Sequence, residues 1–283
     1  MVENLLEVKN LAIRYRSAEA VLHEAVAGVS FEIARGEVLG VMGESGCGKT
    51  SIALALLGLL SRGDAEVSGS IVFRGEDLLA MNEKALQKIR GAAISMVYQE
   101  PGIALSPVMR VGAQIAEIVR AHRKYSRQKC REEAFAMLGR TGLPSTERIF
   151  SAYPHQLSGG QLQRIVLAQA LVCQPALLIA DEPTASLDAQ SRADFIALLR
   201  ELKQSLGISL LLISHTPEIQ ASLADRMIVM KDGKIVEMGA FDDLYRRPSH
   251  PYTKALLAPK GTATLASEAR QGRATHEHLV ETL

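Results

Sequence analysis

The alternation of hydrophobic and polar residues predicts that the chain begins with β structure. Residues 5–15 alternate loosely between apolar and polar side chains, and residues 29–33 alternate cleanly. A period of two places every second side chain of a strand on one face of a sheet. Residues 38–42 form a short apolar run, and residues 68–73 and 94–98 have the composition of further strands, with a turn expected at Gly75-Glu76-Asp77. The first third of the chain is therefore expected to be rich in β-strands.

The pattern becomes helical in the middle of the chain. Residues 111–119 and 131–138 carry apolar side chains at helical spacing, and a basic, polar stretch at residues 122–129 separates them. A strongly helical run follows at residues 162–171. We expect a helical subdomain, at about residues 103–165, inserted into the main fold.

Wholly apolar runs return in the last part of the chain. Residues 176–180 and 208–213 are short and continuously apolar, as is typical of strands buried on both faces of a parallel sheet. A helix is predicted between them, at roughly residues 189–205. Strands that alternate with helices indicate an α/β fold.

The end of the chain combines a hairpin with a segment of different composition. Residues 227–230 and 234–237 flank the turn pair Asp232-Gly233, which predicts a β-hairpin. From residue 259 onward the residues are mostly small and polar. We therefore predict one folded domain over residues 1–258 and a flexible C-terminal tail over residues 259–283.

Composition and charge limit the classes of function. The chain has 32 basic and 31 acidic residues among 283, so its net charge of +1 does not favour a nucleic-acid partner. No signal-peptide pattern is visible at the start, and the longest apolar stretch, residues 52–60, is about half the length of a membrane span. We expect a cytosolic protein that reaches the inner face of the cell membrane only through a partner. The three cysteines, Cys47, Cys130 and Cys173, are scattered and are expected to be free thiols.

The most specific chemical signal is a phosphate-binding loop at residues 43–50. It follows the apolar run at residues 38–42 and leads into a helix-like run at residues 51–57, which is the context that the G-x-x-x-x-G-K-[ST] motif requires. Its glycines allow successive backbone N–H groups to point at a polyphosphate, and the helix start adds a positive dipole end. The residues expected to bind the polyphosphate are Gly43, Glu44, Ser45, Gly46, Cys47, Gly48, Lys49, Thr50 and Ser51. Lys49 would reach the outer phosphates, and Thr50 would place its hydroxyl on Mg²⁺.

Two carboxylates end the apolar run at residues 176–180. In a chain with a phosphate loop, Asp181 is expected to hold hydrated Mg²⁺ and Glu182 to polarise the attacking water. Without the phosphate loop, the pair would be read as a turn.

Three further residues have both a functional and an ordinary interpretation. Gln99, at the end of a predicted strand, could touch Mg²⁺ or the attacking water, or it could be a surface glutamine. His215, after another strand, could donate to the γ-phosphate, or it could simply be exposed. Tyr15 could stack on a nucleobase, or it could be a strand tyrosine that packs on a neighbour.

A second glycine pair lies at the start of a helix. Ser158 precedes Gly159, Gly160 and Gln161, and its hydroxyl suits an N-cap. The segment is either a second anion-binding helix start or only a cap. Cys47 also has two interpretations: its thiol faces the phosphates with a lowered pKa, or it fills space in the core.

Taken in order, these motifs resemble those of the ATP-binding cassette ATPases. The match includes the phosphate loop at residues 43–50, Gln99, the residues 157–161, the pair Asp181-Glu182, the segment Ser186-Leu187-Asp188, and His215. The resemblance extends over about residues 5–258 and implies a P-loop NTPase core of the RecA type, with an N-terminal antiparallel β subdomain and an inserted helical subdomain. It further implies that ATP is closed in by Ser158, Gly159, Gly160 and Gln161 of a second ATPase chain, identical or similar, with Asp188 near the shared site.

Four shorter segments resemble the ATPase subunits of oligopeptide, dipeptide and nickel importers. They are residues 98–101, residues 105–107, residues 153–161 and residues 250–257, of which His250-Pro251-Tyr252-Thr253 is the most specific. The resemblance implies ATP hydrolysis coupled to solute uptake through integral-membrane permeases, with a solute-binding protein as an indirect partner. The alternative is a cassette subunit of a soluble enzyme complex such as the carbon–phosphorus lyase. Ser106 and the pair Thr216-Pro217 depart from the usual pattern, so the transported solute stays open.

Overall fold

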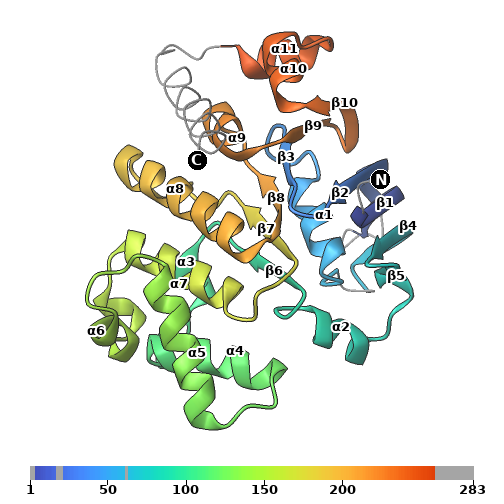
Figure 1. Cartoon of the computed structure of the whole chain (residues 1–283). Coiled ribbons are helices and arrows are strands. Elements are labelled where there is room, and N and C mark those ends of the chain that lie inside the picture. Colours follow the sequence, from blue (N-terminus) through green and yellow to red (C-terminus); the bar gives the residue numbers. More distant parts are fainter. Residues whose placement is uncertain (1–3, 17–21, 61–62, 259–283) are drawn as a thin grey trace, which may run out of the picture.

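Two β-sheets form the frame of the protein. The structure, a computed structural model, describes residues 4–16, 22–60 and 63–258 (Figure 1). The first sheet is antiparallel, with the strand order β2-β1-β4-β5. Its strands are β1 (Asn4–Arg16), β2 (Leu22–Ala34), β4 (Ala65–Phe73) and β5 (Glu76–Asp77). The expected N-terminal antiparallel sheet is confirmed.

The second sheet has six strands in the order β10-β9-β3-β8-β7-β6. They are β3 (Val38–Met42), β6 (Ile94–Val97), β7 (Leu177–Asp181), β8 (Ser209–Ile213), β9 (Arg226–Lys231) and β10 (Lys234–Ala240). All neighbours are parallel except β9 and β10, which form the predicted hairpin. The register sets Val41 of β3 and Asp181 of β7 opposite Ile213 of β8. The carboxyl ends of three central strands therefore meet at one edge.

The apolar strands of this sheet serve two cores, one on each face. Successive side chains of a strand point to opposite faces. On β8, Leu210 and Leu212 belong to a core shared with the helical region, whereas Leu211 and Ile213 belong to a core shared with the N-terminal sheet. The same alternation holds on β7. This explains why these strands read as continuous apolar runs.

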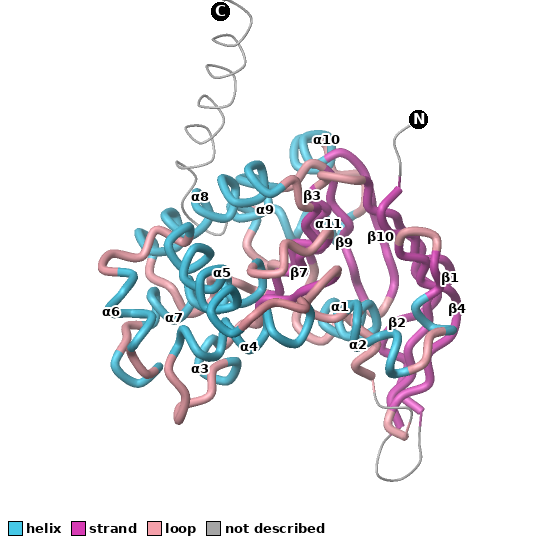
Figure 2. The backbone as a smooth tube through the Cα atoms, turned by 60° about the horizontal axis from the view of Figure 1, so that its bottom comes forward, coloured by secondary structure: helices cyan, strands magenta, loops and turns pink. Residues whose placement is uncertain are grey.

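Helices cover the sheet and form a separate lobe. The helices are α1 (Lys49–Leu56), α2 (Glu83–Ile89), α3 (Pro101–Ala104), α4 (Val111–His122), α5 (Arg127–Arg140), α6 (Thr146–Ser151), α7 (Gly159–Leu171), α8 (Ala189–Leu206), α9 (Pro217–Leu223), α10 (Phe241–Arg246) and α11 (Pro251–Leu257). Short 3₁₀ turns lie at Leu78–Ala80 and Pro154–Gln156. Figure 2 shows α3 to α7 gathered on the side opposite the N-terminal sheet, with the six-stranded sheet between them.

Element limits differ from the sequence-based expectation at two places. β2 begins at Leu22 rather than at residue 29, because it pairs with the whole of β1. The expected turn over residues 75–77 lies instead at Arg74 and Gly75, both at positive φ, and Glu76–Asp77 pairs with β4. Helix α7 begins at Gly159, as an N-cap at Ser158 predicts.

The limits of the domain and of its helical subdomain stay predictions. The helices from Pro101 to Leu171 do lie between β6 and β7 in the chain, as a helical insert requires. The predicted tail, residues 259–283, lies outside the described residues.

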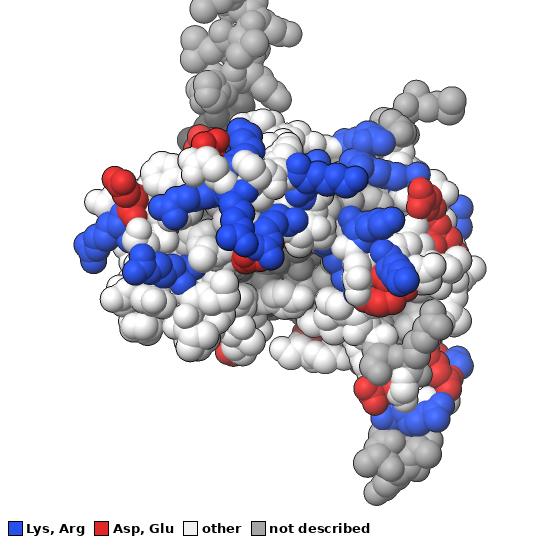
Figure 3. Space-filling model, turned by 90° about the horizontal axis from the view of Figure 1, so that it is seen from below, with Lys and Arg blue, Asp and Glu red and all other residues white. Residues whose placement is uncertain are grey.

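Two surface properties bear on partners. Across the described ranges, no helix has the length and apolar character needed to span a membrane. The face seen from below carries many lysine and arginine side chains and fewer acidic ones (Figure 3). The nearly balanced total charge is therefore unevenly spread over the surface.

Two glycines of the helical region offer a matched test of its packing. Gly112 of α4 lies against Phe150 of α6, so a Cβ at residue 112 would overlap that ring, whereas a Cβ on Gly139 of α5 would meet nothing within 4 Å. We expect Gly112→Ala to lower the free energy of unfolding by about 1–3 kcal/mol through overpacking. Gly139→Ala should raise it by up to about 1 kcal/mol through helix propensity. Urea unfolding of both variants measures the difference, and equal effects of the two substitutions would contradict this packing.

Candidate nucleotide site

The phosphate loop connects β3 to α1 and is shaped by close backbone contacts. A Cβ on Gly48 would overlap the carbonyl oxygen of Ala25 and one on Gly43 that of Met230, so these two positions have no room for a side chain. Gly46 and Gly48 have φ of 84° and 101°, in the left-handed region that favours glycine. The loop is thus held between the N-terminal sheet and β9.

The start of α1 is available to an anion. Gly48 is its N-cap and has no side chain to cap the first N–H groups, and the first turn holds no acidic residue. Uncapped N–H groups at a helix start, together with the helix dipole, favour a bound phosphate. This arrangement fits the polyphosphate of a nucleotide.

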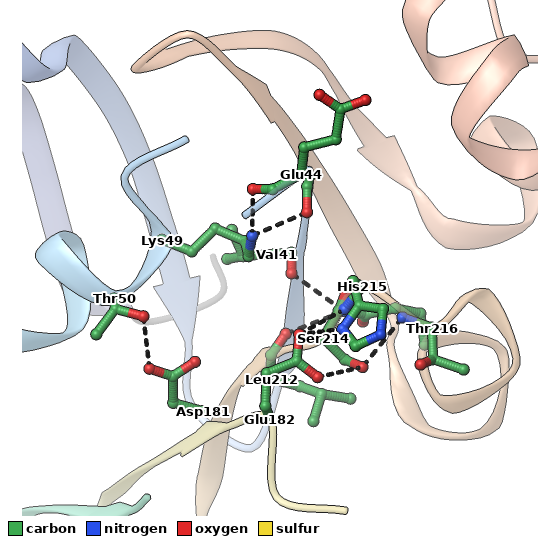
Figure 4. A network of polar contacts seen from close by, with 12 residues as sticks. Val41, Glu44, Lys49, Thr50, Asp181, Glu182, Leu212, Ser214, His215 and Thr216 are labelled. Atoms are coloured by element: carbon green, nitrogen blue, oxygen red, sulfur yellow. Dashed lines mark hydrogen bonds and ion pairs between the residues drawn. The ribbon is translucent and has the colours of Figure 1, made fainter. Parts of the chain in front are cut away.

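The ammonium group of Lys49 is buried and bound to its own loop. Its Nζ donates to the carbonyl oxygens of Gly43 and Glu44, both at 2.8 Å (Figure 4). Only 9% of the residue is exposed. A buried charge requires such partners, and these carbonyls neutralise part of the cost of burial.

Thr50 joins the first turn of α1 to the end of β7. Its hydroxyl donates to Oδ2 of Asp181 at 2.8 Å (Figure 4). Burial raises the pKa of Asp181, and the neighbouring Glu182 adds to this, while the Thr50 hydrogen bond and Lys49 act in the opposite direction. The structure thus brings together Thr50 and Asp181, two of the three residues predicted to hold Mg²⁺.

Glu182 is held by the segment that follows β8. Its Oε1 lies 2.7 Å from Nδ1 of His215 and accepts the backbone N–H of His215 at 2.9 Å, while its Oε2 accepts the Ser214 hydroxyl at 3.3 Å (Figure 4). The backbone of Glu182 has φ of 47°, an uncommon value for a residue with a side chain. The predicted base and the predicted histidine are therefore neighbours.

Sequence reasoning missed a buried amide beneath this segment. The side-chain nitrogen of Gln220, on α9, donates to the carbonyl oxygens of Val41, Leu212 and Ser214. Gly40 leaves the space for it, since a Cβ there would overlap the Gln220 side chain. Gln220 thereby ties β3 to β8 where both reach the site. A glutamine on an otherwise apolar helix face was the only sign in the sequence.

Gln99 and Tyr15 lie at two borders of the site. Val97 of β6 pairs with Ala180 of β7, so Gln99, two residues beyond β6, lies at the same sheet edge as Asp181, and it is exposed. The hydroxyl of Tyr15 donates to Oγ of Ser51 at 3.1 Å, and the partly buried ring packs against the core beneath α1. This is the strand packing that the ordinary interpretation expects, at the border of the phosphate loop.

The second glycine pair forms a capped helix start on the surface. The Ser158 hydroxyl accepts the N–H of Gln161, and the Gln161 side chain accepts the N–H of Ser158, which is a capping box. The exposed Asp188 similarly caps α8 through Ser191. Local caps therefore account for the conformation of both segments within this chain. The roles of all these site residues toward a nucleotide stay predictions.

The position of Cys47 has features of both of its interpretations. The residue is 6% exposed and belongs to the apolar core shared with the N-terminal sheet. A Cβ on Gly43 would lie 2.7 Å from its Sγ, so the thiol occupies the space beside that glycine. Nζ of Lys49 also donates to this Sγ at 3.7 Å, as the first interpretation requires, so the role of Cys47 toward phosphate stays a prediction.

Fold and site together define a phosphate-loop nucleoside triphosphatase, and a family comparison defines it further. Residues 26–185, more than half of the chain, match the model of the ABC transporter family. The chain belongs to this family. It is an ATPase of the ATP-binding cassette type, and the resemblance inferred from the sequence is confirmed.

Two relatives from Bacillus subtilis (strain 168) are similar over most of the chain. The dipeptide transport ATP-binding protein DppD is 42% identical over 257 residues, which cover 90% of this chain and 76% of DppD. The oligopeptide transport ATP-binding protein OppD is 39% identical over 268 residues, covering 94% of this chain and 75% of OppD. Both relatives are named for peptide transport.

Two solved structures share the fold. The dimeric ATP-binding cassette MJ0796 in a post-hydrolysis state bound to ADP and Pi superposes with a TM-score of 0.74 at 26% identity, covering 83% of this chain and 98% of that one. CbiO1 from Clostridium perfringens, part of the ABC transporter complex CbiONQ, also gives 0.74 at 26% identity, covering 96% and 99%. The cassette fold predicted from the sequence is confirmed.

The buried carboxyl group of Asp181 should make stability depend on pH. Its pKa is raised in the folded state, so the folded chain holds this proton more tightly than the unfolded chain does, and stability gained at low pH is lost as the pH rises through the folded pKa. At neutral pH the ionised Asp181 is therefore unfavourable. We expect Asp181→Asn to raise the Tm of the nucleotide-free protein at pH 7.5, with a difference from wild type that shrinks as the pH falls.

Asp188→Asn is the matched control. Hydrogen bonds from Ser191 lower the pKa of Asp188, which is fully exposed, and asparagine caps a helix about as well as aspartate. This variant should have a Tm at or slightly below that of wild type at neutral pH. Thermal unfolding of both variants and wild type between pH 5 and 8 measures these differences in Tm. A Tm for Asp181→Asn below that of wild type at neutral pH would contradict a raised pKa of Asp181 in the folded state.

Proposed function

We propose that this chain energises the uptake of peptides or a related small solute, as an ATPase subunit that works through partner permeases. The observation that carries the catalytic part is the contact between the phosphate loop and the end of β7, through Thr50 and Asp181. The peptide class rests on the similarity to DppD and OppD, which are named for dipeptide and oligopeptide transport. These relatives favour a role in transport. No observation favours the alternative, a subunit of a soluble enzyme complex.

The residues present fit a nucleotide with Mg²⁺. In the described part of the chain, no three His, Cys, Asp or Glu side chains gather to hold a metal ion by themselves. Mg²⁺ is commonly bound by one or two protein ligands together with substrate phosphates and water. Thr50 and Asp181 would supply the protein ligands, and Gln99 would approach from the neighbouring strand end. When bound, Mg²⁺ neutralises charge that develops on the phosphates.

The side chains of this chain would then act by positioning and by holding protons. Lys49 would leave the carbonyl oxygens of its loop and contact the phosphates. Glu182 would turn from His215 and accept a hydrogen bond from water at the terminal phosphate, and His215 would donate to that phosphate. Hydrolysis of phosphates depends mainly on such positioning and charge stabilisation.

A second cassette chain would complete the site. The helix start at Ser158 and Gly159 is exposed, and MJ0796 is a dimeric cassette. We infer that Ser158, Gly159, Gly160 and Gln161 face the nucleotide of a partner cassette, with Asp188 beside it. Permease subunits, and indirectly a solute-binding protein, would couple this closure to transport. The chain itself would act at the cytoplasmic face of the cell membrane.

Glu182→Gln tests the proposed chemistry. We expect ATP affinity to stay within about twofold while hydrolysis falls about 100- to 10,000-fold, because the amide has a similar shape but is a poor base. Nucleotide binding and steady-state hydrolysis, measured on the same preparation, check this. Cells in which the variant replaces the natural chain should lose uptake of labelled dipeptides and oligopeptides.

Glu218→Gln provides the control, since Glu218 is exposed on α9. It should hydrolyse ATP and support uptake as wild type does. Hydrolysis at the wild-type rate by Glu182→Gln would exclude Glu182 as the base. Full peptide uptake in cells that lack the chain would exclude the peptide class of solute.

A mixture of two inactive variants tests the shared site. Ser158→Arg should block hydrolysis while its own phosphate loop still binds ATP, and Lys49→Ala should lose ATP binding. If identical chains pair, mixed dimers contain one intact site, formed by the loop of one chain and the glycine pair of the other, and activity should return in part. Hydrolysis across a titration of the two variants measures this. Rescue would show pairing of identical chains; an inactive mixture, with unmixed wild type also inactive, would indicate a different partner chain.

A further inference from the structure

The C-terminal helix of the described chain touches the phosphate loop through one tyrosine. The backbone N–H of Glu44 donates to the hydroxyl oxygen of Tyr252 at 3.0 Å. The two residues are 208 positions apart in the chain. Tyr252 lies on α11, in the segment His250-Pro251-Tyr252-Thr253, to which neither the fold nor the proposed chemistry gives a role.

The tyrosine is fixed by the β9–β10 hairpin rather than by the loop it contacts. Nζ of Lys231, at the end of β9, lies 5.2 Å from the centre of the Tyr252 ring, a distance typical of a cation–π contact. The carboxylate of Glu237, on β10, accepts the N–H groups of Ser249 and His250 at 2.7 and 3.1 Å, just before α11 begins. The N–H of Tyr252 itself donates to Nδ1 of His250 at 3.2 Å.

The hydroxyl is suited to a steady role as acceptor. Burial raises the pKa of Tyr252 above its usual value, so the side chain stays neutral at physiological pH. Met230, one residue before Lys231, also lies against the loop, because its carbonyl oxygen occupies the space that a Cβ on Gly43 would need. The hairpin and α11 therefore support the first two residues of the loop, Gly43 and Glu44, from one side.

The peptide units around Glu44 connect Tyr252 to Lys49. The N–H of Glu44 binds Tyr252, while its carbonyl oxygen accepts Nζ of Lys49 at 2.8 Å. If Lys49 moves to phosphate, as the proposed function requires, that carbonyl loses the ammonium group and keeps only the weaker contact with the N–H of Cys47 at 3.4 Å. The Tyr252 hydroxyl is then the side-chain contact that still fixes Glu44.

We propose that Tyr252 is a positioning residue for nucleotide binding, which holds the entrance of the phosphate loop in place while Lys49 exchanges loop carbonyls for phosphate. This inference rests on the proposed function for the role of Lys49. The C-terminal segment from Phe241 to Leu257 is then a strap that links the hairpin to the nucleotide site. Without the strap, the loop must be ordered at the moment of binding, and affinity falls by the cost of that ordering.

Tyr252→Phe tests the proposal with the smallest change. It keeps the ring beside Lys231 and removes only the acceptor oxygen. We expect the KM for ATP to rise about 3- to 10-fold, the range for one lost hydrogen bond, with kcat changed less than twofold. In the full-length chain labelled with ¹⁵N-glutamate, the amide proton of Glu44 should shift upfield and exchange faster with solvent, without nucleotide.

Tyr245→Phe is the matched control. Tyr245 lies on α10, is partly buried and stacks on Phe241 with ring centres 5.4 Å apart. It has the same chemistry as Tyr252, and neither the KM for ATP nor the Glu44 resonance should change. Thermal unfolding of both variants should match wild type, which separates positioning of the loop from stability of the fold.

The proposal is overturned by either of two results with Tyr252→Phe. An unchanged Glu44 resonance would show that the contact does not form in solution. A shifted resonance with an unchanged KM would show that the contact forms but does not serve nucleotide binding. If wild type, paired with its partner, hydrolysed no ATP, the proposed function would fail, whereas the Glu44 resonance would still report whether the contact exists.

Discussion

The parallel register of β3, β8 and β7 is the constraint on which the site depends. Because Val41 and Asp181 both lie opposite Ile213, the phosphate loop, the two carboxylates and the segment at His215 leave the sheet at one level. Parallel strands are usually buried on both faces, and here each face has its own apolar core. The two cores fix the strands, and the strands fix the polar groups at their ends.

The polar groups at this edge are bound to one another within the chain. Lys49 is held by carbonyls of its own loop, Asp181 by Thr50, and Glu182 by Ser214 and His215. Each of these contacts offsets part of the cost of removing a polar or charged group from water. The same side chains are those assigned to phosphate, metal and water. Contacts within the chain thus order the side chains that are proposed to bind the nucleotide.

The sequence predicted the parts of this structure that depend on local pattern. The loop at residues 43–50, the carboxylates after β7 and the hairpin at Asp232-Gly233 each follow from residues close together in the chain. It did not predict the contact of Tyr252 with Glu44 or of Gln220 with Val41, since nothing near either residue in the sequence indicates a partner so far away. Cys47 stayed ambiguous for a related reason: which way a loop side chain points depends on Gly43, and on the backbone of β9 that crowds it.

The crossed strand order has a consequence for how the protein folds. β3 comes early in the chain and yet lies between β8 and β9, so Val38 finds its neighbour Leu210 only after most of the chain has been made. Sheets that rely on such distant pairings form slowly, because the entropy cost of closing a large loop comes before the favourable contacts between the strands form. The phosphate loop is flanked on both sides by these late strands. A ligand that binds only the completed sheet stabilises the folded state by mass action. Cellular nucleotide would therefore favour the fully folded cassette over partly folded chains in which the late strands have not yet paired.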